Sequence, residues 1–269
     1  MINKEIQKKL REKYNPDGSD LRIAQLRMCE MLKFIDKICK ENNLIYWLDS
    51  GTLLGAARHK GFIPWDDDTD ICMPLNEVRK LKQIFQEKYQ DSDFVLHCHE
   101  TDSMYMNGWI VLRDLYSEYI QESNLHNIRK YKGLQIDIFP VEDNTVGIFH
   151  YVCAGFQSVF INRLLFSNYR LLHIIASAFY RILYKIIIPI FRFFKNKSCF
   201  YRMSYGCTFR TKRYLSTIYP LSQIEFEGYM FNAPCDVDKY LNNIYKDWKT
   251  IPSEDKIETH DVSFKFYFK

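Results

Sequence analysis

Four acidic side chains are crowded into five positions of this 269-residue chain, where Asp66, Asp67, Asp68 and Asp70 lead into the apolar run 71–73. Successive side chains of a strand point to opposite faces, so Asp68 and Asp70 are predicted to share one face. Two carboxylates about 4 Å apart repel each other by on the order of 4 kcal/mol at an effective dielectric constant near 20. A folded chain therefore needs positive charge at this place.

Two sources of positive charge are open. One is a basic side chain, and Arg58, His59 and Lys60 lie shortly before the aspartates. The other is a divalent metal ion, because clustered carboxylate oxygens are the ligands that Mg²⁺ and Mn²⁺ prefer.

A third carboxylate, Asp137, interrupts the apolar strand candidate GLQIDIF over 133–139. A lone aspartate is rarely buried without a partner. Asp137 is therefore either half of a structural salt bridge or a member of the same site as Asp68 and Asp70. The turn that precedes the aspartates favours the site.

That turn, Ser50-Gly51-Thr52, lies between a strand candidate at 44–48 and a helix candidate at 52–59. The free N–H groups of a helix N-terminus bind phosphate oxygens well, and glycine lets a ligand approach the backbone closely. Gly51 and Thr52 are therefore predicted to hold a substrate phosphate.

The spacing of apolar residues predicts an α/β fold. Helices are expected over 21–41, 75–89 and 236–248, and strands over 44–48, 68–73, 93–99, 108–114 and 133–139. Charge and composition divide the chain into a core that holds the aspartates, a basic helical segment and a C-terminal part, at 1–143, 144–223 and 224–269.

The middle segment has an unusual charge pattern. No Asp or Glu occurs from Asn144 to Ile224, whereas 11 Lys and Arg do, which leaves 26 basic and 33 acidic residues, or −7, for the rest of the chain. On a single helix, five of these basic residues would fall within about a 60° arc. They are Arg163, Arg170, Arg181, Lys185 and Arg192.

A narrow cationic stripe beside a broad apolar surface is typical of a helix that lies in a membrane interface. The alternative is a pair of core helices with a solvated basic face. No uncharged run is long enough for a convincing span. The eight cysteines show no C-x-x-C spacing and the N-terminus has no signal-peptide pattern. We therefore expect a cytoplasmic protein, attached peripherally to an anionic membrane surface at the inner face of the cell membrane.

At the level of whole motifs, the run YWLDSGTLLGAARHKGFIPWDDDTDICMP, 46–74, resembles the signature of the LicD family. That family includes bacterial phosphocholine transferases, fukutin and fukutin-related protein. GLQIDIFPVED, 133–143, resembles its second motif, and residues 226–252 with His260 resemble its C-terminal region, except that Lys246 stands where relatives often have glycine.

The resemblance implies a nucleotidyltransferase-like fold, a mixed sheet flanked by helices, into which the basic, apolar helical segment is inserted. It also implies a metal-dependent reaction. A phospho-alcohol such as phosphocholine would move from a CDP-linked donor to a hydroxyl of a cell-surface glycan or its lipid-linked precursor, with release of CMP. Asp68, Asp70 and Asp137 would be catalytic and would bind Mg²⁺ or Mn²⁺, with Asp137 as an alternative base. The expected substrate contacts are Gly51, Thr52, Arg58, Lys60, Asp66, Asp67, Arg113 and His260.

Several of these residues have an ordinary structural alternative. Asp66 and Asp67 would cap the loop and pair with Arg58, Arg113 would pair with a neighbouring acid, and His260 would be a surface histidine. Two tryptophans, Trp65 and Trp109, would either cage a quaternary ammonium group or belong to the core.

Two other functions are considered. One uses the same carboxylates for catalysis, and the other is not catalytic. In the first, an NTP-dependent nucleotidyltransferase releases pyrophosphate and the basic segment binds RNA. That segment is apolar around most of its surface, which a solvent-filled RNA groove would not need, so no nucleic-acid partner is expected. In the second, a non-catalytic member acts as a membrane-associated partner, but the presence of all three aspartates argues against it.

Overall fold

The computed structural model describes residues 2–121, 127–143, 146–193, 198–257 and 262–267. Its α-helices are α1 (Lys4–Tyr14), α2 (Asp20–Glu41), α3 (Ser50–His59), α4 (Leu75–Lys88), α6 (Gly147–Gly155), α7 (Asn162–Leu165), α8 (Arg170–Ile182), α9 (Ile188–Phe193), α10 (Leu215–Ile218) and α11 (Val237–Tyr245). Other helical turns are η1 (Phe156–Ile161), η2 (Leu183–Ile187) and η3 (Glu254–Lys256). The strands are β1 (Trp47–Leu48), β2 (Asp70–Pro74), β3 (Phe94–His97), β4 (Ile110–Asp114), β5 (Ser117–Gln121), β6 (Gln135–Asp143), β7 (Phe200–Met203), β8 (Arg213–Tyr214), β9 (Ser222–Phe226), β10 (Tyr229–Ala233) and β11 (Val262–Phe266).

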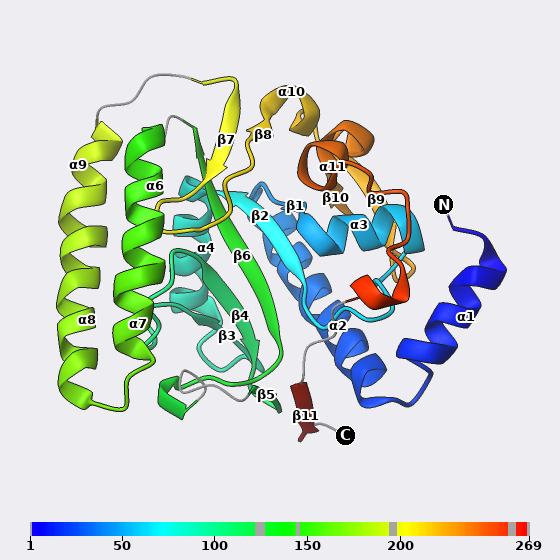
Figure 1. Cartoon of the computed structure of the whole chain (residues 1–269), viewed down its shortest axis with the longest axis horizontal. Coiled ribbons are helices and arrows are strands. Elements are labelled where there is room, and N and C mark those ends of the chain that lie inside the picture. The colour runs from blue at the N-terminus through cyan, green and yellow to red at the C-terminus, as the bar shows by residue number, and fades with distance from the viewer. Residues whose placement is uncertain (1, 122–126, 144–145, 194–197, 258–261, 268–269) are drawn as a thin grey trace.

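The central sheet is mixed. Its strands run in the order β1-β2-β6-β4-β3, and β7 and β8 extend it from the end of β6 (Figure 1). Strands β2 and β6 are parallel, whereas the other described pairs of this sheet are antiparallel. The predicted α/β class, a mixed sheet flanked by helices, is confirmed.

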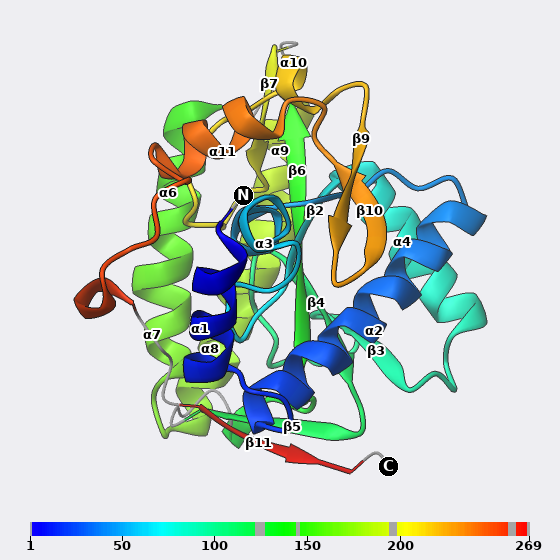
Figure 2. The same ribbon diagram turned by 90° about the vertical axis from the view of Figure 1, so that its right-hand side faces the viewer.

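One face of the sheet is covered by α2 and α4, which lie to the same side of β6 in Figure 2. The side chain of Thr69 contacts Met28 of α2, and Ile71, Ile136 and Ile138 are fully buried. Because side chains alternate along a strand, the residues between these point to the opposite face. Asp70 and Asp137 therefore lie on the face that is turned away from α2 and α4.

The predicted helix at 21–41 is present as α2, and its N-cap residue Ser19 accepts through Oγ a hydrogen bond from the Arg22 N–H at 3.2 Å. The pairing of β5 with β11 was not predicted. Their first residues, Ser117 and Val262, are 262 − 117 = 145 positions apart, and local periodicity carries no signal for so distant a partner.

The acid-free segment forms a helical hairpin, residues 147–193. Its first arm is α6, η1 and α7, and its second arm is α8, η2 and α9. The prediction that one helix carries all five basic residues was wrong, because the chain reverses at 166–169 and leaves Arg163 on the first arm. Arg192 points inward instead of outward, and its Nε and Nη2 donate to the carboxylate of Glu142 at 2.6 and 2.7 Å.

The chain returns to the central sheet after the hairpin. Strand β7 pairs with the end of β6, and β8 pairs with β7. Residues 200–203 and 213–214 of the segment that follows the hairpin are thus part of the central sheet.

Candidate active site

The register of β2 and β6 brings two of the predicted carboxylates together. Asp70 and Asp137 are direct partners in this parallel pair, and the Asp137 N–H donates to the carbonyl of Thr69 at 2.8 Å. Both side chains point to the face opposite α2 and α4. The alternation of side chains along both strands therefore places the two carboxylates next to each other on one face.

Two further aspartates approach the same spot from the loop before β2. Asp66 shares a hydrogen bond with Asp68, and burial together with the Asp68 charge raises the pKa of Asp66 well above its ordinary value. A Cβ atom on Gly51 would lie 2.9 Å from Asp66 Oδ2. A side chain at position 51 would displace the Asp66 carboxylate, so Gly51 leaves room for this carboxylate beside the first turn of α3.

Like charges repel one another within the acidic cluster, which consists of Asp66, Asp68, Asp70 and Asp137. Burial raises the pKa of Asp137 to about 7 and Asp68 adds to this, while Arg113 and the Trp109 N–H act in the opposite direction. Burial, and then the charges of Asp68 and Asp137, raise the pKa of Asp70 well above its ordinary value. Within the described part of the chain, no ion pair joins a lysine or arginine to Asp66, Asp70 or Asp137.

The donor set of this cluster suits a hard divalent cation, because all its donors are carboxylate oxygens. Asp70, which is buried beside two other carboxylates and has no ion pair among the described contacts, also favours such an ion. In residues 2–121, 127–143, 146–193, 198–257 and 262–267, no three side chains of His, Cys, Asp and Glu are gathered closely enough to form a complete metal site. The coordination sphere is thus not pre-formed by the protein alone.

Thr52 holds the acidic cluster in place through the backbone. Its Oγ1 accepts a hydrogen bond from the Asp70 N–H at 2.7 Å, and the Asp70 carbonyl accepts one from the Asp49 N–H at 3.2 Å. The first turn of α3 is thereby fixed to the start of β2.

The basic residues of α3 do not reach the acidic cluster through an ion pair. Arg58 donates from Nη1 to the carbonyls of Trp248 and Thr250, both at 3.1 Å, and its burial lowers its pKa. Lys60 pairs with Glu225 at 2.7 Å. Both residues therefore attach α3 to the C-terminal part of the chain.

Asp67 is held by a tyrosine of β5. Its carboxylate accepts a hydrogen bond from the Tyr119 hydroxyl at 2.7 Å and is buried. An ion pair between Asp67 and Arg58, one of the structural alternatives, is not found among the described contacts.

Two residues of the β4 region face Asp137. Arg113 lies on the same face of the sheet as Asp137, donates from Nη1 to the Gly133 carbonyl at 2.7 Å, and has a buried Nε without a partner. Trp109 Nε1 donates to Asp137 Oδ1 at 3.3 Å. Both groups stabilise the charged form of this carboxylate.

The two tryptophans of the predicted cage have different environments. The Trp109 ring packs on Phe139, whereas the Trp65 ring makes edge contacts with Tyr14 and His59. His260, the remaining predicted substrate contact, lies outside the described residues.

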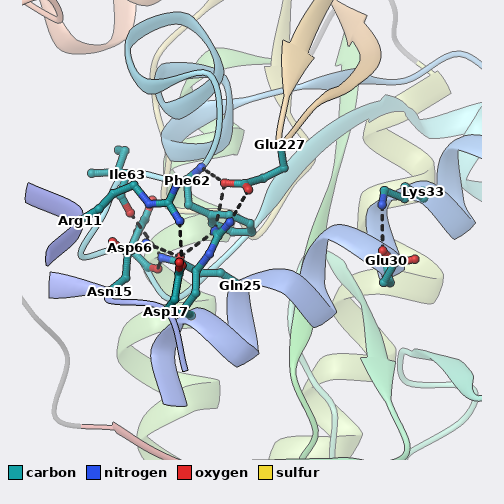
Figure 3. Close-up of polar contacts among 11 residues, drawn as sticks. Arg11, Asn15, Asp17, Gln25, Glu30, Lys33, Phe62, Ile63, Asp66 and Glu227 are labelled. Carbon is teal, nitrogen blue, oxygen red and sulfur yellow. Dashed lines mark hydrogen bonds and ion pairs between the residues drawn. The ribbon is translucent and has the colours of Figure 1, made fainter. Parts of the chain in front are cut away.

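The loop that carries the aspartates is anchored from α2 and from the β9–β10 turn (Figure 3). Gln25 Nε2 donates to the Asp66 carbonyl at 2.8 Å. The Glu227 carboxylate accepts from Arg22 at 3.1 and 2.6 Å and from the Phe62 N–H at 3.1 Å. These partly buried contacts hold the loop at Phe62 and at Asp66.

Comparison with known proteins identifies the region that holds the acidic cluster. Residues 43–157 match the family model described as LicD/FKTN/FKRP, nucleotidyltransferase domain. The chain carries a LicD-family domain. The matched stretch includes β1, β2 and β6, and with them Asp68, Asp70 and Asp137.

Curated relatives of the LicD-family domain include proteins with named activities. The lipopolysaccharide cholinephosphotransferase LicD of Haemophilus influenzae is 42% identical over 71 residues, 26% of this chain and 27% of that protein. The human ribitol 5-phosphate transferase FKRP is 38% identical over 55 residues, 20% of this chain and 11% of that protein. An uncharacterized protein of Rickettsia prowazekii is 31% identical over 137 residues, 44% of this chain and 51% of that protein. The chain spans about half the length of this last relative and less of the other two.

Sequence reasoning missed a buried ion pair that joins the LicD-family signature to a distant arginine. Asp49, the N-cap residue of α3, accepts hydrogen bonds from Arg213 Nη2 at 2.9 Å and from the Tyr240 hydroxyl. Burial opposes the charged carboxylate, but Arg213 and Tyr240 hold the pKa of Asp49 below its ordinary value. Charge counting gave no hint of this role, since it placed Arg213 among the basic residues of the helical segment.

A tyrosine at the end of α11 also faces the acidic cluster of the LicD-family domain. Burial raises the pKa of Tyr245, and the charges of Asp70, Asp49 and Asp66 add to the effect. The next residue, Lys246, has φ 58° and ψ −88°. Glycine adopts such a backbone at little steric cost.

Replacing Lys246 by glycine is expected to stabilise the protein by about 1 kcal/mol, because relief of the left-handed strain exceeds the added entropy of the unfolded chain. Chemical denaturation measures this free energy of unfolding. The matched control is Lys249→Gly, at a position without a positive φ, which should not stabilise. An unchanged or lower stability of Lys246→Gly would show that the backbone here is not strained.

Proposed function

We propose that this protein transfers a phosphorylated alcohol from a CDP-linked donor to a hydroxyl group of a saccharide, in a reaction that requires Mg²⁺ or Mn²⁺ and releases CMP. The observation that carries the proposal is the acidic cluster at the start of α3, inside a domain whose relatives include named phospho-alcohol transferases. The acceptor hydroxyl oxygen would form the new bond to phosphorus. The bond from that phosphorus to the bridging oxygen would break, CMP would leave with the electron pair, and the hydroxyl proton would be released.

The acidic cluster has the charge that such a reaction needs. Asp68, Asp70 and Asp137 would hold the metal ion, which would neutralise the negative charge of the donor diphosphate. Asp66 would add a further oxygen next to Asp68. Thr52 and the Asp49 N–H would keep the Asp70 backbone in position, while Trp109 would keep the Asp137 carboxylate in position.

The first turn of α3 would orient the donor phosphates. It begins beside the carboxylates, and a helix N-terminus attracts anions. Arg58 and Lys60 are engaged with the C-terminal part of the chain, so we do not assign them to the phosphates. Arg113 has a buried donor without a partner and lies on the Asp137 face of the sheet.

The proposal is tested by ³¹P NMR of the purified protein with Mg²⁺, a saccharide acceptor and either CTP or one of the donors CDP-choline, CDP-ribitol and CDP-glycerol. We expect CMP to appear with one CDP-alcohol, slowly even with water as the acceptor, and Asp68→Asn to remove this signal. Asp143→Asn, on the same strand as Asp137 but at its opposite end, is the matched control and should retain turnover.

Other outcomes would replace the proposal. Conversion of CTP to pyrophosphate without turnover of any CDP-alcohol would identify an NTP-dependent nucleotidyltransferase. Absence of turnover with every donor, together with no effect of Mg²⁺ on thermal stability, would identify a non-catalytic member of the family.

A further inference from the structure

The second arm of the helical hairpin exposes a continuous apolar stripe. The exposed side chains that define it are Leu171, Ile174, Ile182, Ile186 and Ile190. They recur at intervals of three, four or eight residues, the spacing of one helix side. The most apolar part of this helix is only 22% buried, so the stripe is not a core surface.

The first arm continues this apolar surface. Phe160 and Phe179 contact each other across the two arms with ring centroids 4.9 Å apart, and each is 37% exposed. Ile148, Val152 and Val159 add further exposed apolar area on the first arm, with Ile148 at 81%. In Figure 1 the two arms lie side by side at one end of the molecule, away from α1 and α11. A soluble monomer rarely exposes so large an apolar surface without a partner.

The charged residues at the margin of this surface all have one sign. Described residues 146–193 contain no Asp or Glu, and Arg163, Arg170, Arg181 and Lys185 are exposed. On the second arm the last three fall within about 60° of one another, directly beside the stripe. This combination fits a surface that is apolar inside and negatively charged at its boundary, as the headgroup region of an anionic bilayer is.

Two other occupants fit less well. A second copy of the chain, placed face to face, would bring like-charged rims together without an acidic side chain to pair with them. A nucleic acid would satisfy the basic rim but would leave the aliphatic stripe in water. The helix Arg170–Phe193 is long and apolar enough to cross a membrane. A crossing would, however, place Arg181 and Lys185 within the hydrocarbon, which is costly.

We propose that the helical hairpin docks on the surface of an anionic lipid bilayer, with its apolar stripe among the acyl chains and its basic rim at the headgroups. Binding in this way leaves the acidic cluster, which is built from β2, β6 and the loop before β2, outside the contact surface. The proposal does not depend on which donor or acceptor the site uses.

Sedimentation with vesicles tests the apolar stripe. The full chain should sediment with vesicles of phosphatidylcholine and phosphatidylserine, and Ile182→Glu/Ile186→Glu should lower the partition coefficient by at least about tenfold. The matched control is Leu26→Glu/Leu115→Glu, which changes two leucines of similar exposure, 48% and 46%, outside the hairpin and should bind normally. Thermal unfolding of each variant separates loss of docking from loss of folding.

The basic rim is tested in the same assay. Arg181→Gln/Lys185→Gln should weaken binding to the anionic vesicles by on the order of tenfold at low salt and should have little effect with phosphatidylcholine alone. Lys8→Gln/Lys9→Gln, which removes two exposed charges of α1, is the control. Equal sedimentation of all variants, a lipid-independent dimer that Ile182→Glu/Ile186→Glu dissociates, or preferential binding to RNA would overturn the proposal. Resistance of cell-membrane-bound protein to alkaline extraction would overturn it in favour of a spanning helix.

Discussion

Replacing Asp70 by asparagine is expected to reduce turnover by roughly 10³-fold or more, and to remove the stabilisation of the protein by Mg²⁺ or Mn²⁺. Asp70 is buried beside Asp68 and Asp137 and has no described counter-ion, so a bound metal ion would neutralise it most directly. An ion at 100 times its dissociation constant stabilises the native state by about 2.7 kcal/mol. For a chain of this size, that corresponds to a rise in melting temperature of roughly 5 °C.

In the absence of a metal ion, the same substitution should stabilise the protein. A carboxylate that is buried among like charges opposes folding, so Asp70→Asn should raise the stability of the metal-free protein by at least about 1 kcal/mol. Melting curves in EDTA and across a Mg²⁺ or Mn²⁺ series measure both effects. Asp143→Asn should keep the wild-type response to metal. A variant Asp70→Asn that is still stabilised by the ion would mean that the acidic cluster does not bind it.

Replacing Arg213 by methionine is expected to cost about 3–5 kcal/mol of the free energy of unfolding and to lower the melting temperature by roughly 10 °C. The side chains of Arg213 and Asp49 are almost completely buried, and Asp49 is the N-cap residue of α3. Removal of the arginine leaves a buried carboxylate without its counter-ion. Arg210→Met removes an exposed arginine from the same segment and should change the stability little.

A double-mutant cycle separates the ion pair from the volume change. Asp49→Asn/Arg213→Met should lose clearly less stability than the sum of the two single changes, because neither partner is then left as an unpaired buried charge. Additive losses would indicate that the two residues do not interact energetically. Denaturant unfolding of the four proteins gives the coupling free energy.

The carboxylate pair at the centre of the candidate site could be predicted from the sequence because its placement depends on local periodicity. Alternation along two apolar strands is sufficient to place Asp70 and Asp137 on one face once the strands are adjacent. The partners of Arg58 and Lys60 could not be predicted in this way. The carboxylates lie at the start of α3 and these two residues at its end, about 15 Å further along a helix of ten residues.

Contacts between distant parts of the chain also left no local signal. Asp49 and Arg213 are separated by 164 residues, and no sequence pattern links them. The turn of the helical hairpin was missed for another reason. The chain reverses at Phe166, Ser167, Asn168 and Tyr169 without a glycine or proline, the usual signals of a turn.

The helical hairpin leaves the sheet at the end of β6 and returns at β7, the strand that pairs with that same end. It is therefore an extended connection between two neighbouring antiparallel strands, not a unit on which the strand order depends. Lineages can lengthen, exchange or delete such a connection while the strand register, and with it the acidic cluster, remains as it is. The surface that we propose docks on a bilayer and the proposed catalytic site can thus change independently.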